Sequence, residues 1–89
     1  MKQFKQHYKA IVSRGKITPD TKVYDFLIKL DEEIEELWNS YNTSSGIESF
    51  DENEVIDVIA VAVNMLIHKG FDVVKLYDEN VKKQLNRKD

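Results

Sequence analysis

Two pairs of acidic residues are the side chains of this sequence best suited to chemistry. Glu33 and Glu36 are three residues apart in one helical segment, and Glu54 and Asp57 are three apart in another. Acids at this spacing share one side of a helix, so each pair offers two carboxylates from one face. Two such helices side by side bring four carboxylates together, a ligand set that suits Mg²⁺ and also Mn²⁺. The spacing therefore predicts a divalent-metal site inside a helical bundle.

Asp57 stands out because the residues around it are apolar. From Val55 to Ile67 every residue is apolar except Asp57 and Asn64. An unpaired buried carboxylate is costly, so Asp57 must meet a cation, reach the surface along its helix, or be neutral. Glu54, Asp57, Asn64 and His68 fall along one narrow strip of the helix, so we expect a polar seam on an otherwise buried element.

Several of these residues also have a structural interpretation. Glu54 lies in the first turn of its helix, where the helix dipole stabilises an acid. Asn64 is equally well explained as a hydrogen-bonded core amide. For His68, in the last turn, the structural role is favoured. Glu32 and Glu35 are expected on the solvated face, where Lys29 and Lys22 are near enough to pair with them.

Four helical segments are predicted to position these side chains. The first covers residues 4–14, the second about 19–41, the third runs to residue 69 and the fourth follows residue 72. Thr18 and Pro19 form a start signal for the second helix. Either Ser49 or Asp51 caps the third helix, and Gly70 ends it. No segment alternates like a strand, so the fold class is all-α with a single domain over residues 1–89.

Composition narrows the class of protein. A chain of 89 residues buries a small share of its surface, so we expect a homodimer or homotetramer in which partner helices cover the third helix. The net charge of −3 argues against binding to polymeric nucleic acid. The chain has no cysteine, its amino terminus lacks the apolar core of a signal peptide, and its longest apolar run is too short to span a membrane. These features predict a cytoplasmic protein.

The order of the acids resembles a known family. Glu32-Glu33-x-x-Glu36, followed by Glu54-x-x-Asp57 in an apolar helix, is similar to the EExxE and ExxD motifs of MazG-like all-α nucleoside triphosphate pyrophosphohydrolases. The similarity covers the second, third and fourth helices. It implies that Glu33, Glu36, Glu54 and Asp57 bind Mg²⁺, with Glu32 as an accessory acid. It also implies hydrolysis of a nucleotide to its monophosphate and pyrophosphate, with Glu33 or Glu36 as the base.

The end of the chain departs from the family pattern. The family often closes with Lys-x-x-x-Asn-x-x-Arg, and the aligned positions here are Asn80, Gln84 and Arg87. Lys82, Lys83 or Lys88 would then supply the missing charge to the phosphates. The candidate substrate-binding residues are Trp38, Asn64, Asn80, Lys83 and Arg87, with His7, Tyr8 and Phe50 as weaker candidates for stacking on a base.

Two other functions fit the same pattern. The first is a non-catalytic helical module that senses a nucleotide or binds a partner as a dimer, and it is favoured by the incomplete closing signature. The second is an enzyme that uses the same acids on a different pyrophosphate, such as a phosphoribosyl-nucleotide.

Overall fold

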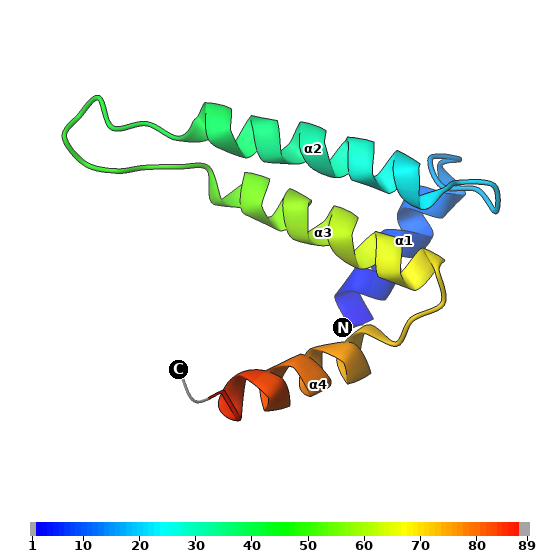
Figure 1. The fold of residues 1–89 in the computed structure, drawn as a ribbon. Coiled ribbons are helices and arrows are strands. Elements are labelled where there is room, and N and C mark those ends of the chain that lie inside the picture. Colours follow the sequence, from blue (N-terminus) through cyan, green and yellow to red (C-terminus); the bar gives the residue numbers. More distant parts are fainter. Residues whose placement is uncertain (1, 88–89) are drawn as a thin grey trace.

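The computed structural model describes residues 2–87, which form four α-helices (Figure 1). The helices are α1 (Lys2–Ser13), α2 (Val23–Ser40), α3 (Glu52–His68) and α4 (Val73–Leu85). Residues 2–87 contain no strand, and a single β-bridge between Asn42 and Ser49 narrows the loop that joins α2 to α3. The predicted all-α class is therefore confirmed.

The helices are arranged around α3. α2 and α3 run antiparallel side by side, and α1 crosses behind the end of α3 (Figure 1). α4 leaves the end of α3 and turns back, with a gap between it and the α2–α3 pair that widens toward its own end (Figure 1). Among the described residues, no helix is long and apolar enough to cross a membrane.

The predicted breaks around α3 and α4 are confirmed. Asp51 caps α3 by accepting a hydrogen bond from the Asn53 N–H at 2.9 Å, whereas Ser49 is used in the β-bridge. Gly70 has a φ of 84°, and the Phe71 N–H donates to the Leu66 carbonyl at 3.0 Å, which closes the last turn of α3. Asp72 caps α4 by accepting from the Lys75 N–H at 3.2 Å.

The start of α2 differs from the prediction. The helix begins at Val23 and not at Pro19, because the residues before it form a separate turn. In this turn the Thr21 N–H donates to the Thr18 carbonyl at 3.0 Å, and the Asp25 side chain accepts from the Lys22 N–H at 2.8 Å. Thr18 therefore stabilises a turn, and Asp25 satisfies the first backbone donor of the helix.

His68 joins three parts of the fold. The Tyr8 hydroxyl lies 3.0 Å from His68 Nδ1, and His68 Nε2 lies 2.8 Å from the Thr21 carbonyl oxygen. A carbonyl oxygen only accepts, so Nε2 carries the hydrogen and Nδ1 of the neutral ring accepts from the hydroxyl. The Phe26 ring packs 5.3 Å from the imidazole, centroid to centroid. The structural role predicted for His68 is thus confirmed.

The single chain leaves much apolar surface uncovered. The buried hydrophobic residues are Ile17, Phe26, Ala60 and Val63. On α3, Ile56 is 56% exposed, so this helix is not buried on all sides by its own chain. The predicted covering of α3 by a partner subunit stays a prediction.

Candidate metal centre

Three carboxylates converge where α2 and α3 lie side by side. Glu33, Glu36 and Glu54 each contribute one carboxylate oxygen, and these three oxygens lie within 4.8 Å of one another. Glu33 is only 7% exposed, Glu54 is half-buried and Glu36 faces solvent. The two helices therefore place one buried and one exposed acid from α2 against an acid in the first turn of α3.

Two oxygens of this cluster lack a hydrogen-bond donor. Within residues 2–87, Glu33 Oε2 and Glu54 Oε2 are buried and have no hydrogen-bond partner. A carboxylate only accepts hydrogen bonds, so three of them facing one another need a proton or a cation between them. A hard divalent cation prefers such oxygen ligands, so the donor set fits Mg²⁺ or Mn²⁺.

The protonation of Glu36 reflects the same crowding. Hydrogen bonding of a protonated Glu36 to the nearby Glu33 carboxylate, and then the negative charge of Glu33, raise the pKa of Glu36 above its usual value, with a smaller contribution from the charge of Glu54. The raised pKa favours the protonated form of Glu36, which lowers the repulsion among the three carboxylates.

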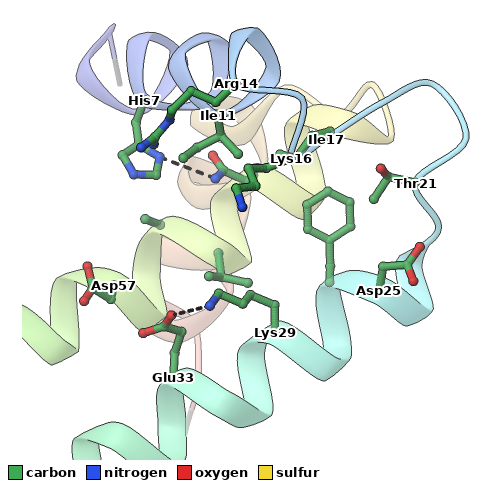
Figure 2. A pocket seen from close by; sticks show the side chains of 14 residues that line it. His7, Ile11, Arg14, Lys16, Ile17, Thr21, Asp25, Lys29, Glu33 and Asp57 are labelled. Carbon is green, nitrogen blue, oxygen red and sulfur yellow. Dashed lines mark hydrogen bonds and ion pairs between the residues drawn. The ribbon is translucent and has the colours of Figure 1, made fainter.

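The two oxygens of the Glu33 carboxylate differ, because Lys29 pairs with only one of them. The Lys29 Nζ lies 3.2 Å from Glu33 Oε1 (Figure 2). The same Nζ lies 3.4 Å from Glu32 Oε2. The hydrogen bond to Glu33 raises the pKa of Lys29, so the ammonium stays charged. One Glu33 oxygen is therefore paired with Lys29, and the other remains free for the acidic cluster. The expected pairing of Lys29 with the outer acid Glu32 is confirmed. The additional contact with Glu33 was missed, although the four-residue spacing between Lys29 and Glu33 is a signal for it.

Asp57 is placed differently from the expectation. It does not belong to the group of oxygens within 4.8 Å, and it is exposed, which is one of the three outcomes expected for its carboxylate. Asp57 lines a cavity together with Glu33, one helical turn beyond Glu54 (Figure 2). It reaches the surface along the polar strip of α3, which avoids the cost of burial. The structure therefore gathers three of the four predicted ligands.

The cavity lies between α1, α2 and α3 and has a volume of about 520 Å³. Its polar lining residues include Glu33 and Lys29 of α2 and Asp57 and Asn64 of α3. His7 of α1 lines it too, and Arg14 and Lys16 approach from the connection between α1 and α2 (Figure 2). These last two cations have no feature in the sequence that singles them out.

The other predicted substrate-binding residues are spread over the molecule. Trp38 is 70% exposed and packs edge-on against Tyr41, beside a separate hollow. Asn80 and Lys83 are exposed on α4, and Arg87 follows that helix and donates to the Gln84 side chain at 3.5 Å. Of the five main candidates, Asn64 alone among the described residues lines the cavity that Glu33 lines, and the weaker candidate His7 lines it as well. Lys88 lies outside the described residues.

Comparisons of this chain with protein-family models, with curated proteins and with solved structures gave no match. The similarity to MazG-like pyrophosphohydrolases consequently depends on the pattern of acids alone, and it stays a prediction.

Proposed function

We propose that this protein is a Mg²⁺-dependent nucleoside triphosphate pyrophosphohydrolase, which converts a nucleoside triphosphate and water to the monophosphate and pyrophosphate. The observation that supports it is the convergence of Glu33, Glu36 and Glu54 with two buried oxygens that lack partners. Such a site is suited to holding a divalent cation beside an open cavity, as phosphate chemistry requires.

The proposed ligands are these three glutamates together with Asp57, whose side chain lines the cavity beside Glu33. Mg²⁺ held by these residues would neutralise charge on the phosphate oxygens and would lower the pKa of a bound water. Lys29 keeps one oxygen of Glu33 fixed, which holds the other oxygen toward the cluster.

Glu36 is the residue best placed to act as the base. It is exposed, whereas Glu33 is buried and already pairs with Lys29. In the reaction, water oxygen bonds to the α-phosphorus, the bond from that phosphorus to the bridging oxygen breaks, and pyrophosphate leaves with the bond electrons. Glu36 accepts the proton that the attacking water loses.

The test is release of pyrophosphate from a panel of nucleoside triphosphates with and without Mg²⁺. We expect Glu54→Gln to lower the rate by more than about a hundredfold, because loss of a direct ligand costs more than loss of a residue that supports one. Glu35→Gln is the matched control, since Glu35 lies exposed on α2 outside the cluster, and it should keep the wild-type rate. No release from any nucleotide would refute the hydrolase.

One observation favours a non-catalytic nucleotide-binding module as the second candidate. α4 carries the incomplete closing signature, and none of its described residues lines the cavity beside Glu33. Calorimetry combined with the pyrophosphate assay distinguishes the two functions. A module would bind a nucleotide with Mg²⁺ and release no pyrophosphate, whereas the hydrolase would release it.

A further inference from the structure

Asn64 is a buried polar residue that the acidic cluster does not use. It is 4% exposed on α3, and its Nδ2 lies 3.4 Å from Nδ1 of His7 on α1. Among the described residues its Oδ1 is buried and has no hydrogen-bond partner. A buried acceptor without a donor is uncommon in folded proteins and calls for an explanation, such as a ligand that supplies the donor.

Asn64 lines the cavity between α1, α2 and α3, which has the size and lining of a small-molecule site. Its volume of about 520 Å³ lies within the usual range for such sites. Its walls combine apolar side chains, such as those of Phe26, Ala60 and Val61, with polar and charged side chains around them. Apolar walls beside polar groups suit a flat ring that carries hydrogen-bonding groups on its edge.

The contact between Asn64 and His7 fixes which hydrogen-bonding groups these two residues offer to the cavity. An amide nitrogen only donates, so Nδ1 of His7 accepts and the neutral ring carries its hydrogen on Nε2. Asn64 Oδ1 is left as an acceptor, and His7 Nε2 is a donor. A nucleobase edge presents donors and acceptors side by side, which matches this pair of groups.

Glu33 links this cavity to the acidic cluster, because it belongs to both. We infer that the cavity holds the nucleoside part of the substrate and that Asn64 determines base specificity by accepting a hydrogen bond from the base. This inference rests on the proposed function for the choice of a nucleotide as ligand. Arg14 and Lys16 add positive charge at the cavity, and neither side chain forms an ion pair within residues 2–87.

The experiment measures nucleoside binding without metal, so that it does not depend on hydrolysis. The full chain, labelled with ¹⁵N, is titrated with the common nucleosides and their monophosphates in EDTA, and the amide shifts are followed by NMR. We expect at least one base to bind in the millimolar range, to shift the Asn64 side-chain amide, and to bind better than the other bases. In Asn64→Leu the affinity for that base should fall about tenfold, and the preference should disappear.

Two further measurements separate a specific role from a structural one. Thermal melting of Asn64→Leu shows whether the fold is kept, and Asn64→Asp keeps an acceptor in nearly the same shape. The matched control is Val63→Thr, which changes polarity at a buried neighbour on α3 that does not line the cavity, and it should keep the base preference.

Three results would overturn the inference: no shift for any nucleoside, equal binding of all bases by the wild type, or an unchanged preference in a folded Asn64→Leu. Failure of the proposed hydrolase would appear separately, as base-selective binding to a protein that releases no pyrophosphate.

Discussion

At the scale of single residues, Glu36 contributes a pH dependence to the stability of the metal-free protein. The pKa of Glu36 is raised above its usual value of 4.5 in the folded state, mainly through Glu33. Between the usual and the raised value, the folded chain binds more protons than the unfolded chain. The free energy of unfolding therefore falls as pH rises through this interval, and the loss stays at higher pH.

Melting curves in EDTA from about pH 4 to about pH 7 test this dependence. In Glu36→Gln we expect the part of the pH dependence of the melting temperature that comes from Glu36 to vanish. We also expect Mg²⁺ to raise the stability of the wild type at the upper end of this pH range. If Glu36→Gln kept the pH dependence of the wild type, another group would have to account for it.

Asp57 gives a second test at this scale. It is exposed and is not in the group of converging oxygens, so Asp57→Asn should change the stability of the metal-free protein by less than about 0.5 kcal/mol. As a proposed ligand it should still matter for the ion, and we expect the variant to bind Mg²⁺ at least about tenfold more weakly by calorimetry. Unchanged affinity would remove Asp57 from the ligand set and leave three glutamates.

At the scale of helices, the ends of α3 fix the direction in which α4 leaves. Gly70 has a φ of 84°, a conformation that costs a residue with a side chain about 1–2 kcal/mol. A Cβ at this position would meet no atom within 4 Å, so the cost comes from the backbone alone.

Gly70→Ala should accordingly lower the free energy of unfolding by about 1–2 kcal/mol in urea denaturation. Gly70→Asn is the control, and it should lose less because asparagine enters the left-handed region more readily. Equal stability of the alanine variant and the wild type would mean that this turn is not strained.

His68 also affects how the helices are positioned relative to one another. It connects α1 through Tyr8 and the turn before α2 through Thr21, so it also positions two walls of the cavity. Because α1 packs on α3 and supplies His7, the connection through His68 helps to hold this wall of the cavity in place.

At the scale of the whole molecule, the single chain is more open than a compact protein of its mass. Its accessible surface is 7276 Å², whereas a compact monomer of 10.4 kDa exposes about 5,400 Å². Its radius of gyration is 15.8 Å, compared with about 12 Å for a compact chain of 89 residues. The excess surface is of the size that a stable subunit interface buries, so we expect the chain to associate with copies of itself.

α4 offers the clearest surface for this association. It has no buried residue, and Val74, Tyr77, Val81 and Leu85 recur at helical spacing as an exposed apolar stripe. A helix of 13 residues is marginal by itself, so α4 gains most from a partner.

Light scattering after size exclusion should give a dimer or tetramer for the wild type. Tyr77→Glu should shift it toward the monomer, because it places a charge on the stripe. Lys75→Gln changes the net charge by the same amount beside the stripe and should keep the assembly. A wild-type monomer at all concentrations would contradict the expectation.

Much of the local structure could be predicted from the sequence, because it depends on neighbouring residues. Asp51, Gly70 and Asp72 mark helix ends through hydrogen bonds and backbone angles within a few residues, and the structure confirms them. The start of α2 was missed because Thr18 and Pro19 suit a turn as well as a helix end, and local spacing does not distinguish the two.

Which residues meet in the candidate site depends on how helices that are far apart in the sequence pack together. Spacing alone placed Glu33 and Glu36 on one side of α2, and only the tertiary structure decided that Glu33 is buried while Glu36 is exposed. The offset between α2 and α3 decided that Glu54 joins them and that Asp57 lies one turn away at the cavity. The contact of Asn64 with His7 arose only when α1 packed across α3, since these residues are far apart in the chain. Sequence periodicity determines which side chains share a helix face, whereas the relative position of two helices follows from packing between them.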